Sequence, residues 1–329
     1  MIESAYMLST RMSLAEIGRG SGFIGAAAFI VILFSAAVSA QVKKPAASPA
    51  RSINVVTEPD ATVWIDGVQY GKTDKLGNLT ISTVAAGAHT LRVRANGFKE
   101  ISRPLGIAQK GDVEVALVKT TDEAELAYQK AEMLTTSDRE AAAEAYRSAV
   151  KLRPKYAEAY LGLARVLAEL GDHEEALAAI AGARKSRPGY PEASAVEGRI
   201  FREAGEEAKA IASFKRAISE GKGFQPEAYT GLGLYFKEKG EGAGGDLDAE
   251  TAGYTESAKY LKTALKQLSG APDTIVIYQL LGLVYERMKK YQDAISIYEE
   301  FLRIFPNSGE ASAVSSFIVQ LKKQMSEQE

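Results

Sequence analysis

Side chains that could do chemistry are few in this 329-residue sequence. It contains no cysteine and only two histidines, His89 and His173. The lack of cysteine excludes disulfides, thiolate metal sites and cysteine nucleophiles together. Neither histidine has neighbours spaced as in a metal site or a catalytic triad, and no nucleophile-elbow or zinc-protease motif occurs. We therefore expect neither catalysis nor a cofactor nor a metal.

Two glycine motifs resemble nucleotide-binding loops but lack their context. Gly20, Gly22 and Gly25 form a GxGxxG match that no predicted strand precedes. Gly71-Lys72-Thr73 resembles the end of a phosphate-binding loop, yet Asp66 stands where that loop needs glycine. A carboxylate at that position would repel phosphate, and the GxGxxG match lacks its preceding strand, so we expect both motifs to be structural.

Composition limits the partners. The 40 lysines and arginines nearly balance the 42 acidic residues, which leaves a net charge of -2. Such a balance gives no field to attract a polyanion, so nucleic acid is not an expected partner. An apolar share of 46% is typical of a folded chain, and the length suffices for two or three domains.

The N-terminal residues have the pattern of a secretion signal. No charge occurs from Gly22 to Ala40, and the small residues of Val38-Ser39-Ala40 suit a signal peptidase. We expect a signal peptide over 1–40 and a linker over 41–51, so that the protein is exported to the periplasm or cell envelope. An uncleaved membrane anchor is the alternative, because the uncharged stretch approaches the roughly 20 residues that span a bilayer.

Residues 52–119 alternate between apolar and polar side chains, as half-buried strands do. Strands are predicted over 53–57, 62–65, 79–82, 90–95 and 112–118. The predicted inward side chains are Val63, Ile65, Leu91, Val93, Val113 and Val115. Asp66-Gly67 predicts a type I′ hairpin, and Asn96-Gly97 is expected to repeat it. These features indicate a small all-β, sandwich-like domain.

The same residues resemble a known module. The segments 58–67, 71–73, 86–93 and Gly97-Phe98 are similar to the PEGA family of small extracytoplasmic β-domains. Asp74 departs from the pattern, since the family usually has proline there. The resemblance implies an envelope setting and a structural or binding role. Trp64 and Tyr70 could instead stack on a sugar ring, which would make the domain a cell-wall glycan-binding module.

A repeat of 34 residues begins after Asp122. Pro154 and Pro188 are separated by this period, and Tyr160, Leu163 and Ala164 open a helical pattern that returns one period later. A later copy contains Tyr278, Leu281-Gly282, Tyr285, Ala294, Tyr298 and Pro306. This pattern resembles the tetratricopeptide (TPR) family, which implies an all-α superhelix. We expect five TPR-like repeats over 122–308 and a capping helix over 309–325.

The fourth repeat is longer than the others. Its excess lies within Glu241 to Gly253, where glycine is frequent, so we expect an inserted loop there. Asp246, Asp248 and Glu250 alternate as in a calcium loop, but its glycine and distal glutamate are absent.

The resemblance also implies a ligand surface on the concave side, formed by the first helices of successive repeats. The groove candidates are Arg165, Arg199, Arg202, Lys237 and Arg287. They could pair with carboxylates of an extended peptide, or they could be a solvated face. Glu158, Glu192 and Glu227 on the same helices make the groove mixed. The predicted function is an extracytoplasmic protein-interaction scaffold, with a membrane-anchored assembly factor as the alternative.

Overall fold

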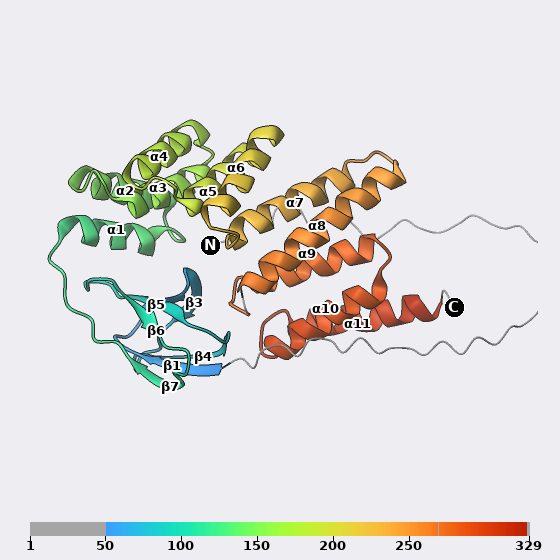
Figure 1. Ribbon diagram of the computed structural model, residues 1–329, viewed down its shortest axis with the longest axis horizontal. Helices are drawn as coiled ribbons and strands as arrows, with labels where there is room; N and C mark the ends of the chain where they lie inside the picture. The colour runs from blue at the N-terminus through green and yellow to red at the C-terminus, as the bar shows by residue number, and fades with distance from the viewer. Residues whose placement is uncertain (1–50, 269, 328–329) are drawn as a thin grey trace, which may run out of the picture. The chain divides into compact units, whose positions relative to one another are not determined.

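The computed structural model describes residues 51–268 and 270–327. The predicted signal peptide, its cleavage site, the linker up to residue 50 and the GxGxxG match lie outside the described residues. Within them, seven strands precede eleven helices (Figure 1). The predicted fold class, a small β-domain followed by a helical repeat array, is confirmed. No helix of the described part is long and apolar enough to cross a membrane.

The β-domain consists of two sheets. Its strands are β1 (Arg51–Val56), β2 (Thr62–Ile65), β3 (Val68–Lys72), β4 (Asn78–Val84), β5 (His89–Arg94), β6 (Ile101–Leu105) and β7 (Gly111–Glu114). One sheet has the order β4-β1-β7, in which β1 and β7 run parallel, and the other has the antiparallel order β3-β2-β5-β6. All six predicted inward side chains are buried in one core.

The sequence prediction missed two strands, β3 and β6, and both are edges of the second sheet. Pro104 lies inside β6 opposite Thr90. Proline cannot donate a ladder hydrogen bond, which argues against a central strand but not against an edge strand. β3 contains Gly71 and ends at Lys72, and neither residue type favours a strand. Edge strands therefore carried the weakest sequence signal.

The two Asx-Gly turns of this domain differ. Asp66 and Gly67 both have positive φ, at 51° and 82°, as the predicted type I′ turn between β2 and β3 requires. After β5 only Gly97 has positive φ, and the Phe98 amide donates to the Ala95 carbonyl at 3.2 Å. The predicted repetition of the type I′ turn is therefore wrong. β5 and β6 still pair antiparallel, through a longer connection.

The helices follow as antiparallel pairs. They are α1 (Glu123–Leu134), α2 (Arg139–Leu152), α3 (Ala157–Leu170), α4 (His173–Ser186), α5 (Pro191–Glu203), α6 (Glu207–Glu220), α7 (Pro226–Glu241), α8 (Leu247–Leu268), α9 (Thr274–Arg287), α10 (Tyr291–Ile304) and α11 (Ala311–Ser326). Each odd-numbered helix up to α9 packs on the next helix, and α11 packs on α10. This is the arrangement of a helical repeat array.

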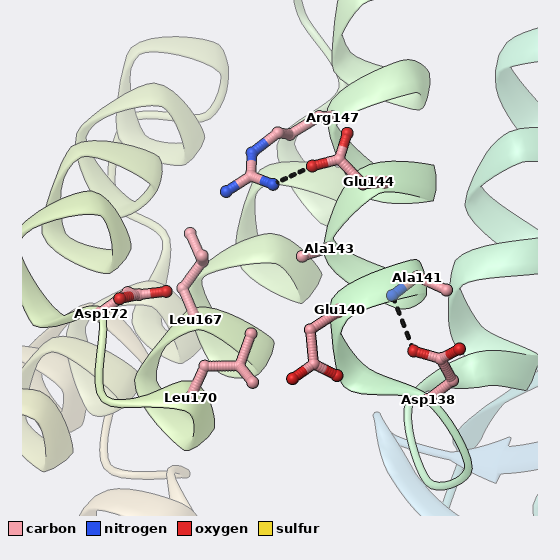
Figure 2. A pocket seen from close by; sticks show the side chains of 9 residues that line it. All are labelled: Asp138, Glu140, Ala141, Ala143, Glu144, Arg147, Leu167, Leu170 and Asp172. Atoms are coloured by element: carbon pink, nitrogen blue, oxygen red, sulfur yellow. Dashed lines mark hydrogen bonds and ion pairs between the residues drawn. The ribbon is translucent and has the colours of Figure 1, made fainter.

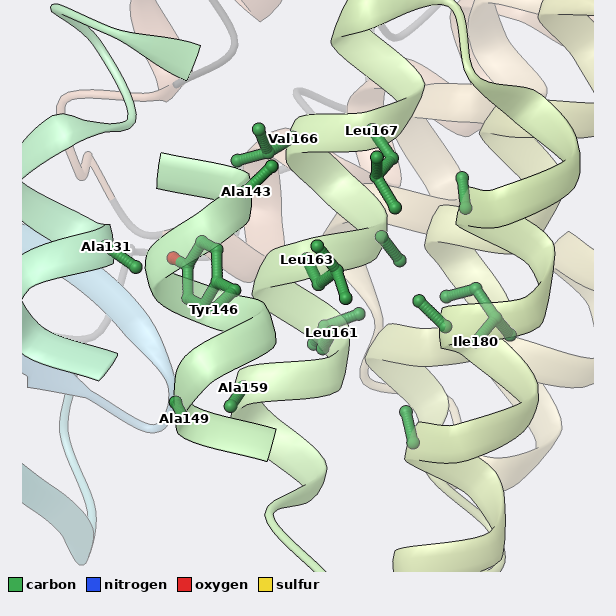
Figure 3. Close-up of a cluster of buried hydrophobic side chains, with 14 of the residues drawn as sticks. Ala131, Ala143, Tyr146, Ala149, Ala159, Leu161, Leu163, Val166, Leu167 and Ile180 are labelled. Carbon is green, nitrogen blue, oxygen red and sulfur yellow. The ribbon is translucent and has the colours of Figure 1, made fainter. Parts of the chain in front are cut away.

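Small residues allow the paired helices to approach closely. A Cβ atom added to Gly198 would lie 2.6 Å from the Phe214 ring, and one added to Gly282 would lie 2.2 Å from the Tyr298 ring. Figure 3 shows the core of the first repeats, with Tyr146 of α2 beside the buried side chains of α3. Glycine is needed at these positions because an aromatic side chain of a neighbouring helix fills the space.

The second and third helix pairs begin with the same arginine–tyrosine contact. Arg153 lies over the Tyr156 ring and Arg187 lies over the Tyr190 ring, each at 4.4 Å. Each arginine also pairs with an acid at the start of the preceding first helix. These acids are Asp122 and Glu158, respectively. The arginine and the tyrosine recur at an interval of 34 residues and the acid at an interval of 36. We call this unit the arginine clasp.

The fourth repeat differs from its prediction. The expected inserted loop is wrong, because α8 begins at Leu247 and is 22 residues long, which leaves only residues 242–246 between α7 and α8. The Asp246 carboxylate accepts from the amides of Asp248 and Ala249, so it caps the helix. A Cβ atom on Gly253 would lie 2.7 Å from the Gly240 backbone. Gly242, Gly244 and Gly245 do lie in the short connection. Gly253, at the end of the predicted loop, lies instead where the two helices touch.

Candidate partner-binding groove

The first helices of the second, third and fourth repeats contact one another directly. α3 packs on α5, and α5 packs on α7. These contacts place the candidate cations of α3, α5 and α7 on neighbouring helices. Arg287 is the last residue of α9 and is exposed. Its helix packs instead on the long α8.

Arg165 of α3 forms an ion pair that crosses the third repeat. Its Nη2 lies 2.6 Å from Oε2 of Glu227 on α7, 62 residues away, and the two side chains are 29% and 25% exposed. Burial disfavours the charged guanidinium, but the Glu227 carboxylate outweighs this effect, so the pKa of Arg165 is raised. α3 and α7 are thereby tied together across the helix that separates them.

Arg199 and Arg202 lie one turn apart on α5. The Nε and Nη2 atoms of Arg199 are buried and have no hydrogen-bond acceptor. Nη1 of Arg202 is likewise buried without an acceptor, and the Glu238 carboxylate of α7 is 3.8 Å from it. In the described part of the chain, Arg199 is the only side chain with two such atoms.

Lys237 of α7 is already paired within its own helix. Its Nζ donates to both carboxylate oxygens of Glu241 at 2.8 Å, and its side chain is 15% exposed. The five predicted residues therefore divide into two that are internally neutralised, Arg165 and Lys237, two that carry unsatisfied donors, Arg199 and Arg202, and one at the end of a later helix, Arg287.

Comparison with known proteins agrees with this geometry. Residues 52–121 match the family model of the PEGA domain, and residues 134–200 and 278–308 match models of the tetratricopeptide repeat. The chain is a PEGA domain followed by TPR repeats. TPR arrays bind protein partners, so the protein is a protein-interaction scaffold. Both families are non-catalytic, and no catalytic family matches.

Solved TPR structures are similar in fold. Yeast Tom70 aligns with a TM-score of 0.50 at 16% identity over 62% of this chain, which spans 41% of the Tom70 chain. A thermophilic TPR protein of Thermus thermophilus aligns at 0.46 and 20% identity, over 60% of this chain and 99% of its own. PilF of Pseudomonas aeruginosa aligns at 0.42 and 22% identity, over 52% and 69%. No curated protein sequence matches the chain.

The PEGA domain is joined to the first TPR helix by buried polar side chains. Arg94 of β5 pairs with Glu132 of α1 at 2.8 Å and lies over the rings of Trp64 and Tyr128. Burial opposes its charge, but Tyr128 and Glu132 raise the pKa of Arg94. Gln129, which is 3% exposed, accepts from the Gly97 amide and donates to the Phe98 carbonyl, both at 2.8 Å. The sequence analysis did not find this junction.

The two aromatic residues considered for glycan stacking differ in exposure. Trp64 is 6% exposed, and the guanidinium groups of Arg92 and Arg94 lie 4.2 and 4.9 Å from its ring centre. Tyr70 is half-buried, and burial together with the nearby Asp66 raises its pKa to about 12. Arg92 and Arg94 cover the ring of Trp64 on which a sugar would stack, so the structure contradicts glycan stacking on Trp64.

His89 has a structural role. His89 Nδ1 lies 2.6 Å from an Asp66 oxygen and Nε2 lies 2.9 Å from the Ala85 carbonyl, so the ring fastens the β2–β3 turn to the start of β5. His173 is the first residue of α4. No group of three or more acidic or histidine side chains in the described residues could hold a metal ion.

A shallow hollow of about 380 Å³ lies between α2 and the end of α3. Figure 2 shows its apolar floor, Leu167 and Leu170, and the carboxylates around it. Asp138 caps α2 by accepting from the Ala141 amide at 2.9 Å, and Glu144 is bound by Arg147. Since the Asp138 and Glu144 carboxylates are already bound within the fold, we interpret the hollow as part of the packing between α2 and α3.

Proposed function

We propose that the protein is an exported envelope scaffold whose α3–α5–α7 face binds a segment of a partner protein. The observation that carries this proposal is the direct contact of three first helices, on which Arg165, Arg199 and Arg202 lie. Unsatisfied guanidinium donors are costly in a folded protein unless a ligand completes them. A face of this kind suits recognition of an extended acidic segment.

In this proposal the PEGA domain is a spacer or an attachment to an envelope component. It is fixed to the array by Arg94 and Gln129, so it sets the orientation in which the array is presented. Export rests on the uncharged stretch from Gly22 to Ala40 and its small-residue ending.

Site-specific photo-crosslinking tests the partner-binding face. In one protein a photoreactive amino acid replaces Glu238, a residue of α7 that lies beside Arg202 of α5. In a matched protein it replaces Lys215, an exposed residue of the second helix α6. We expect a discrete crosslinked protein from position 238 and none from position 215. Equal crosslinking at both positions, or none at either, would refute binding of a partner protein at the α3–α5–α7 face.

Export has its own test. The full chain is expressed with a C-terminal tag in a bacterium, and the N-terminus of the recovered protein is sequenced. We expect Gln41 as the first residue and recovery in the periplasmic fraction. An intact N-terminus in the membrane fraction would favour the membrane-anchored assembly factor, and an intact N-terminus in the cytoplasm would refute both.

A further inference from the structure

The junction between the first and second repeats has an apolar core. Val150 of α2 packs in the same hydrophobic core as Tyr160 and Leu163 of α3. The Tyr160 ring fills the space above Gly182 of α4, where an added Cβ atom would lie 2.6 Å from it. Water is excluded from this junction because its facing surfaces are apolar and closely packed.

The corresponding positions of the next junction are all polar. The residues 34 positions further along the chain are, in the same order, Arg184, Ser194, Glu197 and Arg216. The changes compensate one another in size, since a tyrosine facing a glycine has become a serine facing an arginine. The repeat period and the helices are retained, while the chemistry of the junction has changed.

These side chains form one network among α4, α5 and α6. Arg184 of α4 donates to both oxygens of the Glu197 carboxylate, at 3.1 and 3.2 Å, and to the Ser194 hydroxyl at 2.7 Å. Arg216 of α6 pairs with the same carboxylate, and its Nε donates to Ser194 at 3.2 Å. Ser194 is fully buried, whereas 14% of the Glu197 side chain is exposed. One carboxylate of α5 thus binds an arginine from each neighbouring helix.

The hydrophobic core is divided at the same place. Val196 and Ile200 of α5 belong to the core that begins at α1, whereas Ala195 of α5 belongs to a separate core with Phe214 of α6 and Leu232 of α7. The polar network therefore joins two apolar bodies that meet at α5.

A polar junction opens at a lower cost than an apolar one. Separating apolar surfaces exposes them to water, which is unfavourable in proportion to their area. Hydrogen bonds to charged groups are exchanged for bonds to water with a small net change. Water has access here, because the side chains of Arg184 and Arg216 are 25% and 42% exposed. Nε of Arg184 is buried and lacks an acceptor even in the closed junction.

An ion pair spans the same repeat on the face of the first helices. Arg165 of α3 and Glu227 of α7 lie 2.6 Å apart, and α5 packs on both of their helices. Each side chain is about a quarter exposed, so salt in the solvent weakens their attraction. A change in the angle between the second and third repeats would separate these two groups.

We propose that the junction of the second and third repeats is a hinge of the array, and that the Arg165–Glu227 pair is a salt-sensitive strut that holds it closed. Bending at the polar network changes the separation of α3 and α7, and with it the width of the α3–α5–α7 face. The bending belongs to the array itself, so it is measured without a partner and does not depend on the proposed function.

Double electron–electron resonance tests the hinge, because a chain without cysteine can carry two nitroxide labels at introduced cysteines. One label pair, Ser148→Cys on α2 and Lys239→Cys on α7, spans the junction. The control pair, Lys130→Cys on α1 and Ala181→Cys on α4, lies entirely before it. All four positions are exposed. The chain from Gln41 onward is measured at low salt and in about 1 M sodium chloride.

The expected result is a loss of order confined to the spanning pair. We expect its distance distribution to become about twofold wider at high salt, and that of the control pair to stay the same. Glu227→Gln removes the strut, so the distribution should be equally wide at low salt and should not respond to salt. Unchanged widths in Glu227→Gln would overturn the strut.

The second arm gives the hinge the residues of the preceding junction. The fourfold variant Arg184→Val/Ser194→Tyr/Glu197→Leu/Arg216→Gly should show a narrow distribution at both salt concentrations, since apolar side chains replace a partly buried ion network. Arg184→Val/Glu197→Leu is the second variant in case the fourfold variant does not fold, as judged by circular dichroism. Widening that persists in the folded apolar variant would overturn the hinge. So would equal widening of both label pairs, or no widening of the parent at high salt.

Discussion

Neighbouring elements of this protein are joined in two different ways. Arginine side chains join the PEGA domain to α1 and join the first three helix pairs, through Arg94 and the arginine clasps. In the fourth repeat, α7 and α8 meet through the backbones of Gly240 and Gly253. An arginine joint depends on charge and on a partner acid. A glycine joint depends on the absence of side-chain volume. The same helix pair also has one buried hydrogen bond, from the Ser257 hydroxyl to the Gly233 carbonyl at 2.7 Å.

The largest expected effect concerns the arginine joint at the PEGA domain. Arg94→Ala leaves the Glu132 carboxylate without its buried partner and uncovers the Trp64 ring. We expect the free energy of unfolding to fall by about 3 kcal/mol, measured by urea denaturation. Arg103→Ala, on the neighbouring edge strand β6, is the control and should cost less than about 0.5 kcal/mol. Equal losses for both variants would show that the junction contributes no specific stability.

The glycine joint is tested by Gly253→Val. The new side chain would meet the Gly240 backbone at 2.7 Å and the Phe236 carbonyl oxygen at 3.0 Å, and neither can rotate away. Overpacking should cost about 2 kcal/mol, even though valine favours a helix more than glycine does. Gly309→Val, at a position with no heavy atom near the added Cβ, should change the unfolding free energy by less than about 0.5 kcal/mol. A stable Gly253→Val protein would mean that α7 and α8 can separate.

The arginine clasps should be interchangeable. Arg153→Ala and Arg187→Ala each remove one ring contact at 4.4 Å and one partly exposed ion pair. We expect each variant to lose about 1 kcal/mol of unfolding free energy. Arg303→Ala removes only an exposed pair within α10 and should lose almost nothing. Clearly different losses at Arg153 and Arg187 would break the equivalence of the two repeats.

The smallest effect is a pH dependence at the PEGA junction. Burial raises the pKa of Glu100 above its ordinary value of 4.5, although Arg92 and Arg94 act against it. The folded state therefore binds this proton more tightly, and stability falls as pH rises from the ordinary pKa through the raised one. Glu100→Gln cannot titrate, so its stability relative to the parent should increase over that window, by less than about 1 kcal/mol. Urea midpoints from about pH 4 to about pH 7.5 measure this, and a relative stability that decreases with pH would contradict the assignment.

Much of the fold could be predicted from local pattern. The interval between Pro154 and Pro188 predicted helix pairs, and the alternation around Leu91 and Val93 predicted a half-buried strand. The lengthened α8 could not be predicted, since glycine has the same one-letter pattern in a loop and at a close helix crossing. The distinction depends on which backbone lies opposite, and only the tertiary structure supplies that.

The groove shows the same limit. The repeat period selected Arg165 and Arg199 because they occupy the same place in successive repeats. Glu227 was visible as a neighbouring acid on a first helix, but its pairing with Arg165 spans 62 residues and depends on how α3, α5 and α7 pack. Spacing identified the residue types of the face, whereas helix packing determined which of them are already paired.

The amide of Gln129 also has a consequence for the order of folding. It binds one backbone amide and one carbonyl of the β5–β6 connection, and both groups are in position as soon as the PEGA domain has folded. Because repeat arrays gain order from neighbour to neighbour, a preformed surface at one end sets the register of the next helix. The PEGA domain leaves the ribosome before the array, so we expect it to act as a template from which helical order spreads toward α11.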